Sequence, residues 1–155
     1  MRKFKEMKEN NKGFSLVELI IVIAIMAVLV GVLAPQFIKY VESSKQSTDI
    51  QNAAEIRAAV EAFVAEKAPT SNITVKVGAN AIAVSGGAYT DGGTAKTVTD
   101  ALTEVGLSAS TPTKSTGWEA TAKDVAVYDI ATFKWTTTAQ PNTKNPKKDI
   151  ADAFK

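Results

Sequence analysis

The hydrophobic pattern of the chain is dominated by one apolar run near the N-terminus. From residue 14 to residue 34 there are 21 residues, and only Ser15 and Glu18 among them are polar. About 20 consecutive apolar residues form a helix long enough to cross the hydrocarbon core of a bilayer. The run therefore predicts a membrane-spanning helix over residues 14–34.

Beyond Pro35 the apolar residues occupy only one side of a helix. They recur at intervals of three or four residues, the spacing of an amphipathic helix, and they are Ile50, Ala53, Ile56, Val60, Phe63 and Val64. We assign Asp49 to the opposite, polar face, and we expect Glu42 and Lys45 to form a solvated pair. The pattern predicts that the helix continues over residues 35–67 and that its apolar stripe packs against a globular domain.

Residues 68–155 predict that domain, called the head below. Pro69 ends the long helix, because a proline disfavours helical dihedral angles in the preceding residue. We expect strands at 73–77 and 81–84, paired as a hairpin, and further strands at 118–121, 125–130 and 132–138. A helix is predicted over 94–105, ended by Gly106, with loops at 85–93, around Tyr89, and at 108–117. The fold class is α+β, a long N-terminal helix packed against a small antiparallel sheet.

Apolar and aromatic residues in strand-like contexts are expected to fill the core of the head. They are Trp118, Val125, Val127, Phe133 and Trp135, while Ile150 and Phe154 fix the C-terminal tail. Asp91-Gly92-Gly93 could suggest a calcium loop, but no ligand spacing supports one. Turn chemistry explains these three residues, so no metal site is predicted.

Composition and charge exclude several function classes. The chain has no Cys and no His, which excludes the usual zinc sites and the thiol or imidazole nucleophile–base pairs of many enzymes. No paired carboxylates stand at a recognisable spacing, so we predict neither an enzyme nor a cofactor. Without residues 1–13, the chain has 13 basic and 14 acidic side chains. This near-neutral balance does not support direct nucleic-acid binding.

The residues before the apolar run are strongly basic, with five Lys or Arg against two Glu in residues 1–13. By the positive-inside rule, the N-terminus stays in the cytoplasm. Glu18 is the anomaly inside the run, because a carboxylate in a spanning helix costs about 2.5–3.5 kcal/mol on insertion scales. We therefore predict that Glu18 is functional and has a partner.

These residues resemble the N-terminal signature of the type IV pilin family, which includes the pseudopilins. The signature is a short basic leader that ends in Gly, followed by Phe, with Glu as the fifth residue of the apolar segment. Here these residues are Gly13, Phe14 and Glu18, and a long aliphatic run and Pro35 follow them. The resemblance covers roughly residues 8–65. Residues 68–155 carry no motif of the family.

The resemblance implies a processing and assembly pathway. A prepilin peptidase of the membrane cuts between Gly13 and Phe14, which removes residues 1–13, and methylates the new Phe14 amine. The Glu18 of one subunit then pairs with the Phe14 amine of a neighbour. The expected function is the structural subunit of a type IV pilus, a helical homo-oligomeric fibre built by the pilus assembly machinery. Its precursor is a single-pass membrane protein, and the finished fibre is extracellular. Many Gram-negative pilins close a disulfide that this chain cannot form, which favours a Gram-positive source.

Other readings of the N-terminus remain open. A pseudopilin of a type II secretion or DNA-uptake machine shares the same signature, and a membrane-anchored extracellular binding module is the alternative from another class. An ordinary secretory signal has an apolar region of 7–15 residues, and a small-residue cleavage site ending at Ala34 would place Pro35 directly after the cut. An anchor that is never processed is the fourth reading.

The turn from Gly31 to Pro35 is the weakest part of the predicted helix. Pro35 has no N–H to donate to the carbonyl of Gly31, and its ring crowds that carbonyl. Glycine inside a helix costs about 1 kcal/mol relative to alanine. We expect a kink here in the free subunit and a stretched or locally unwound turn in a packed fibre.

Overall fold

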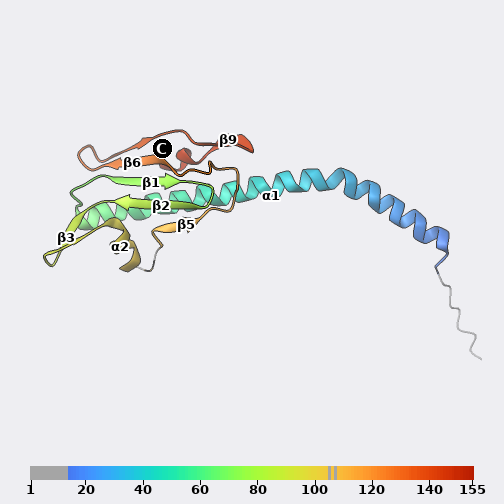
Figure 1. The fold of residues 1–155 in the computed structure, drawn as a ribbon, viewed down its shortest axis with the longest axis horizontal. Coiled ribbons are helices and arrows are strands. Elements are labelled where there is room, and N and C mark those ends of the chain that lie inside the picture. The colour runs from blue at the N-terminus through green and yellow to red at the C-terminus, as the bar shows by residue number, and fades with distance from the viewer. Residues whose placement is uncertain (1–13, 105, 107) are drawn as a thin grey trace, which may run out of the picture. The chain divides into compact units, whose positions relative to one another are not determined.

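The computed structural model describes residues 14–104, 106 and 108–155 (Figure 1). Gly13 and the rest of the predicted leader lie outside the described residues. The chain divides into two compact units, residues 1–39 and residues 40–155. Helix α1 (Leu16–Lys67) belongs to both units and begins two residues after the predicted start at Phe14.

The apolar stripe of α1 packs against the head, as the sequence predicts. Ala53, Val60, Phe63 and Val64 are buried, and Ile50 and Ile56 are partly buried against the same core. The helix ends where Ala68 adopts a left-handed conformation, with φ of 45°, a position that glycine usually takes. Residue 67 is the last helical residue, so the predicted end of the helix is confirmed.

The head is built on a five-stranded antiparallel sheet in the order β5-β2-β1-β6-β7. The strands are β1 (Ile73–Val77), β2 (Ala81–Gly86), β5 (Ser110–Pro112), β6 (Lys123–Asp129) and β7 (Lys134–Thr137). Strand β1 is central, and its alternate residues Ile73, Val75 and Val77 are fully buried. The predicted hairpin of β1 and β2 is confirmed, with Val75 opposite Val84. The structure therefore confirms the α+β class.

The region from Tyr89 to Gly106 differs from the prediction. A hairpin of β3 (Tyr89–Asp91) and β4 (Thr94–Lys96) replaces the expected loop and the first turn of the expected helix. Gly92 and Gly93 form its turn at φ values of 56° and 84°, where a Cβ would be strained. Tyr89 is buried, and its ring packs edge-on against Phe63 at a centroid distance of 5.3 Å. Helix α2 (Val98–Glu104) is correspondingly shorter than predicted.

The C-terminal part of the head is held by apolar contacts of the tail. After β8 (Pro141–Asn142) and β9 (Asn145–Asp149) comes the 3-10 helix η1 (Ile150–Phe154). Ile150 and Phe154 are buried, as predicted. Phe154 packs against Trp135 at a ring centroid distance of 5.0 Å, and Trp135 is partly buried.

Three predictions for this part of the head are wrong. Residues 118–121 are not a strand, although Trp118 is buried as expected. Residues 132 and 133 belong to the turn before β7, and Phe133 is 69% exposed rather than buried. Val127 is only partly buried. The exposure of Phe133 has a local cause, since the turn holds this residue at φ of 54° and directs it away from the core.

Asp49 is fully buried and does not lie on the polar, solvated face that the sequence predicts for it. Its carboxylate accepts hydrogen bonds from the backbone N–H groups of Lys114 and Ser115, at 2.7 and 2.9 Å. The indole N–H of Trp118 donates to it at 2.8 Å. Asp49 therefore fixes the loop of residues 114–118 to the helix.

Glu42 also has a different partner from the one expected, because it accepts a hydrogen bond from the Ser115 hydroxyl rather than pairing with Lys45. The same hydroxyl oxygen accepts from the Asn142 side-chain amide at 3.0 Å. Asn142 in turn accepts from the Gln46 side-chain amide at 3.0 Å. We call this set the polar anchor; its members are Glu42, Gln46, Asp49, Ser115, Trp118 and Asn142. It attaches the loop of residues 114–118 and strand β8 of a cysteine-free head to α1.

Candidate functional site

The first turn of α1 contains a hydrogen bond that involves the anomalous carboxylate. The backbone N–H of Ser15 donates to Glu18 Oε2 at 2.9 Å, and the N–H of Leu19 donates to the carbonyl of Ser15 at 3.1 Å. This is one half of a capping box, in which an acidic side chain three residues along satisfies the N–H of the capping residue. Phe14, directly before it, is 91% exposed. Glu18 therefore closes the N-terminal end of the helix and is the fifth residue after the predicted cleavage point.

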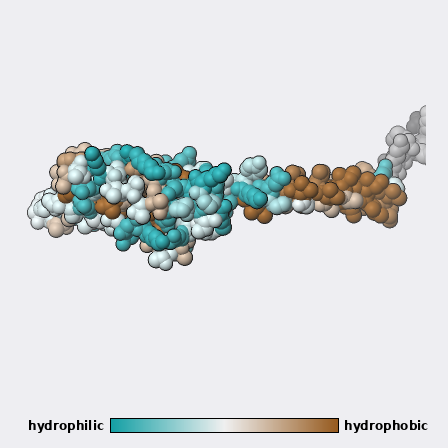
Figure 2. Space-filling view, turned by 90° about the horizontal axis from the view of Figure 1, so that it is seen from above, coloured by the Kyte–Doolittle hydropathy of each residue, from teal (hydrophilic) through white to brown (hydrophobic). Residues whose placement is uncertain are grey.

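The apolar segment, residues 14–34, exposes its side chains on every side. Its large aliphatic residues from Leu16 to Leu33 are all at least 46% exposed. Among the described residues, one helix is long and apolar enough to cross a membrane, and it is α1 near its N-terminus. Figure 2 shows the visible face of this segment in brown. A surface of this kind requires lipid or other protein around it, because such a large exposed apolar area is unfavourable in water.

The structure places the predicted weak turn, Gly31 to Pro35, inside the continuous helix α1. Apart from the helix backbone and chain neighbours around it, no described atom lies within 4 Å of a Cβ added to Gly31. Packing within one subunit therefore does not require glycine at this position. The predicted kink stays a prediction.

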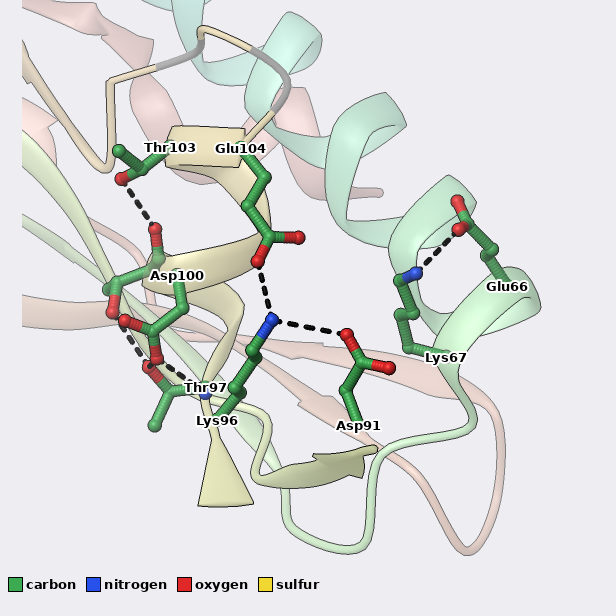
Figure 3. A network of polar contacts seen from close by, with 9 residues as sticks. Glu66, Lys67, Asp91, Lys96, Thr97, Asp100, Thr103 and Glu104 are labelled. Carbon is green, nitrogen blue, oxygen red and sulfur yellow. Dashed lines mark hydrogen bonds and ion pairs between the residues drawn. The ribbon is translucent and has the colours of Figure 1, made fainter. Parts of the chain in front are cut away.

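A network of exposed polar side chains holds the β3–β4 hairpin to α2 (Figure 3). The Lys96 ammonium donates to Glu104 at 2.6 Å and to Asp91 at 3.1 Å. The hydrogen bond with Glu104, followed by that with Asp91, raises the pKa of Lys96, and Lys96 lowers the pKa of the Asp91 carboxyl. At the start of α2, the backbone N–H and the hydroxyl of Thr97 donate to Asp100 and lower its pKa. These contacts are structural, since they orient α2 on the surface of the head.

The described residues of the head contain no cluster of side chains that could hold a metal ion. Within residues 14–104, 106 and 108–155, no group of three or more Asp or Glu side chains is placed to hold a metal ion. Asp91-Gly92-Gly93 forms the turn of the β3–β4 hairpin. The site that the sequence predicts, Phe14 to Glu18 followed by the apolar segment, is therefore the main candidate for function. The helix cap formed by Ser15 and Glu18 could have been predicted from the sequence, because the spacing Ser15-x-x-Glu18 is that of a capping box.

Comparisons with known proteins support the same N-terminal region. Residues 8–34 match the family described as the prokaryotic N-terminal methylation motif. Prepilin peptidase-dependent protein A of Clostridium perfringens is 45% identical over 73 residues, which are 46% of this chain and 52% of that protein. Type IV major pilin protein PilA of Myxococcus xanthus is 38% identical over 69 residues, 44% of this chain and 31% of that protein. Fimbrial protein EcpC of Eikenella corrodens is 27% identical over 142 residues, 89% of each chain.

The chain spans about half the length of the first of these relatives and less of the second. No solved structure matches it. The similarity to a Clostridium protein fits the Gram-positive source expected from the absence of cysteine.

Proposed function

We propose, on the premise that its N-terminal segment is that of the type IV pilin family, that this chain is a structural subunit of a type IV pilus. The observation that carries the proposal is the apolar segment, exposed on every side, with its single carboxylate at the N-terminal end. Such a surface suits two successive environments, first the bilayer and then a bundle of neighbouring helices. Two of the relatives reported above are named as a type IV major pilin and a fimbrial protein, which favours a pilus subunit over a secretion pseudopilin.

The proposed pathway begins in the membrane. The precursor crosses the bilayer once through residues 14–34, with its N-terminus in the cytoplasm. A prepilin peptidase cuts between Gly13 and Phe14 and methylates the Phe14 amine. The assembly machinery then transfers the subunit into an extracellular helical fibre, in which the heads form the surface. The chain is the substrate of the peptidase and carries out no catalysis itself.

In this pathway Glu18 changes partners. In the precursor, one carboxylate oxygen accepts the Ser15 N–H and satisfies the end of the helix. After cleavage, the Phe14 amine of a neighbouring subunit supplies a positive charge at the same depth. Pairing of the two charges offsets the cost of holding a carboxylate in apolar surroundings, and it selects docked subunits over free ones.

The experiment separates the capping role from the pairing role. Glu18→Gln keeps an oxygen that can accept the Ser15 N–H but removes the charge, and Glu18→Ala removes both. If pairing operates, both variants should be cleaved and inserted normally and both should give few fibres. Normal fibre yield from Glu18→Gln, together with loss from Glu18→Ala, would reduce Glu18 to a helix cap.

Processing is tested on the fibres themselves. Mass spectrometry of surface fibres removed by shearing should find peptides that begin at a methylated Phe14 and none that span residues 13 and 14. Recovery of the uncut peptide in quantity from assembled fibres would contradict the proposed cleavage. Absence of this chain from any fibre would contradict the proposed function as a whole.

A further inference from the structure

The lysines of residues 40–155 fall into two groups. In the first group each ammonium forms an ion pair with a carboxylate, and its members are Lys67, Lys76, Lys96, Lys123 and Lys155. The second group forms no ion pair with any described residue. It consists of Lys134 at the start of β7, Lys45 on α1, Lys114 in the loop of residues 114–118, and Lys144, Lys147 and Lys148 in the β8–β9 hairpin. We call the second group without Lys134 the lysine patch.

Contacts with α1 place the β8–β9 hairpin beside Lys45. The Lys148 ammonium donates to the Ser43 carbonyl at 3.4 Å and to the Ser47 hydroxyl. Lys45 lies between these two serines in the sequence, within the same turn of the helix, and is exposed. Strand β9 therefore runs next to the part of α1 with which residues 40–155 begin (Figure 1).

The loop of residues 114–118 completes the patch. The Lys144 ammonium donates to the Thr116 hydroxyl at 2.5 Å, and the backbone N–H of Lys114 donates to Asp49 on α1. The patch therefore lies around α1 between residues 42 and 49. The side chains of Lys45, Lys114, Lys144 and Lys147 are exposed, and that of Lys148 is half-buried.

The carboxylates nearest to the patch in sequence are occupied by donors of the protein. Asp49 is buried and accepts three hydrogen bonds, and Glu42 accepts one from a serine hydroxyl. Asp149 accepts from the N–H groups of Gln140 and Ala151, both at 2.9 Å. The ammonium groups of the patch, by contrast, are presented to the surroundings, so this end of the head offers positive charge to a partner.

The patch follows the apolar segment closely along the chain. Helix α1 is continuous between them, and Lys45 comes eleven residues after Ala34, which corresponds to about 17 Å of helix. The headgroup layer on each side of a bilayer takes up about 5–8 Å of this length. Charges act in solution over a Debye length of about 8 Å at physiological ionic strength. A membrane around residues 14–34 is therefore within electrostatic reach of the patch.

Tyr40 adds a second feature that suits the surface of a membrane. Its side chain is 73% exposed, and it lies on α1 just before the patch. Six residues of helix separate it from Ala34, about 9 Å, which is close to the depth of the headgroups. Tyrosine is enriched at this depth in membrane proteins, because its ring is apolar and its hydroxyl is polar.

The composition of the patch indicates which kind of anion it binds. It contains only lysines, and a lysine ammonium is a flexible point charge, whereas arginine holds a single phosphate or carboxylate in a fixed fork. Flexible point charges spread over one end of a domain suit a fluid layer of many phosphates. Lysines close to an anionic lipid surface each strengthen binding about fivefold.

We infer that the lysine patch, with Tyr40, docks the head on the anionic phospholipid headgroups of the membrane that holds the precursor. The inference rests on the proposed function, because it requires residues 14–34 to be inserted in a bilayer. Docking fixes the orientation of the head on the membrane before the subunit enters a fibre, and transfer into the fibre then breaks this contact.

The test measures how closely each end of the head approaches the lipid. The chain contains no cysteine, so a single introduced cysteine carries a fluorophore. Ala120→Cys is exposed and lies two residues after Trp118, on the side of the patch, and Ala131→Cys is exposed in the turn after β6. Strand β6 (Lys123–Asp129) lies between the two positions, which places the labels at opposite ends of a strand about 23 Å long.

The labelled full chain is reconstituted in vesicles of phosphatidylcholine, with or without phosphatidylglycerol. Both kinds of vesicle contain a lipid with a spin label on its headgroup, which quenches the fluorophore on contact. Phosphatidylglycerol should increase the quenching at position 120 and leave position 131 unchanged. The increase should disappear at about 1 M salt, where the Debye length falls to about 3 Å.

Two charge-matched double variants locate the effect. Lys144→Gln with Lys147→Gln removes two charges of the patch and keeps Lys148, whose hydrogen bonds hold β9 on α1. It should lower the ratio of docked to free heads about 25-fold, about fivefold for each lysine. Lys134→Gln with Lys155→Gln removes the same charge from the surface near β7 and should leave the ratio unchanged. An unchanged Tm for both variants shows that their heads are folded.

Three results would overturn the inference. The first is equal quenching at position 120 with and without phosphatidylglycerol. The second is an equal loss of quenching in the two double variants. The third is that the detergent-solubilised full chain binds a double-stranded DNA oligonucleotide through Lys144 and Lys147 while phosphatidylglycerol has no effect, which would make the patch a nucleic-acid surface.

Flotation of the same samples separates this inference from the proposed function. A chain that does not float with phosphatidylcholine vesicles is not anchored by residues 14–34, which overturns the proposed membrane precursor and the docking together. A chain that floats but shows no quenching that depends on phosphatidylglycerol overturns the docking alone. The proposal of a pilus subunit then stands.

Discussion

Removal of the Asp49 carboxylate should detach the 114–118 loop from α1 and strongly destabilise the head. Asp49→Ala leaves three donors without their acceptor, the N–H groups of Lys114 and Ser115 and the indole of Trp118. Each hydrogen bond to a charged group contributes about 1.5–3 kcal/mol, and such contributions are not additive. We therefore expect a loss of about 3–6 kcal/mol, a large part of the 5–15 kcal/mol that stabilises a typical domain.

Asp49→Asn separates charge from shape. An amide has one acceptor oxygen, which can keep the two bonds made by Oδ2 while its NH₂ faces the N–H of Lys114. The expected loss is about 1–3 kcal/mol, between those of wild type and Asp49→Ala. Urea titration of the full chain in detergent, followed by tryptophan fluorescence, measures both, with Glu55→Ala as the exposed control on the same helix. If Asp49→Ala lies within about 0.5 kcal/mol of wild type, as surface substitutions do, the polar anchor does not attach the loop.

Three further predictions concern other parts of the chain. Gly117→Ala should destabilise the head by more than about 1 kcal/mol, because its Cβ would lie 2.1 Å from Asn142 Oδ1; thermal unfolding measures this. The hydrogen bond from Arg57 lowers the pKa of Glu61 below the usual 4.5. Ionised Glu61 therefore stabilises the head at pH values above 4.5, and this stabilisation is lost as the pH falls through the pKa that Glu61 has in the folded state. The difference in Tm between wild type and Glu61→Gln should therefore shrink as the pH is lowered below 4.5. A fibre map should show Gly31 to Pro35 stretched or unwound, and an unbroken straight helix over residues 29–40 would contradict that expectation.

Periodic burial explains which elements could be predicted from the sequence. Val75 and Val84 lie in strands whose alternate residues face the core, so the limits of β1 and its hairpin with β2 follow from the pattern alone. The same holds for the apolar stripe of α1 from Ala53 to Val64. In each case the hydrophobic free energy acts on one face of a regular element, and the face is visible in the spacing.

The errors arose where hydrophobicity and local conformation disagree. Phe133 was predicted to be buried because it is apolar, but the hairpin places it in a left-handed turn outside the core. Thr94 to Lys96 was predicted as helix because the apolar residues that follow have helical spacing, whereas the Gly92-Gly93 turn draws these three residues into a hairpin. Turn geometry overrode the wider pattern in both places.

The N-terminal site also has a part that can be predicted from the sequence and a part that cannot. The exposed apolar segment follows from composition alone, and the Ser15-x-x-Glu18 spacing is that of a capping box. The partner of Glu18 after cleavage depends on a second subunit. Its identity rests on the resemblance of the segment to a family, and on the proposed pathway.

The burial of the polar anchor is not predicted from the sequence because its residues are polar, although their positions along the helix indicate it. Glu42, Gln46 and Asp49 continue the spacing of the buried stripe toward the N-terminus, at intervals of four and three residues before Ala53. A polar residue in the phase of a buried stripe indicates a hydrogen-bonded contact, since burial without a partner is costly.

On the proposed pathway, in which the subunit begins in a membrane, this choice of polar contacts has a consequence. Apolar residues at positions 42, 46 and 49 would attach the head equally well, but they would also extend the lipid-compatible surface of α1 beyond Pro35. An Asp at the centre of a bilayer costs about 2.5–3.5 kcal/mol on insertion scales, so Asp49 opposes any shift of α1 that would bring this part of the helix into the lipid. The hydrogen bonds of the anchor therefore perform two tasks with one set of side chains. They hold the loop of residues 114–118 and Asn142 of strand β8 on the helix, and they end the membrane-compatible surface before the head begins.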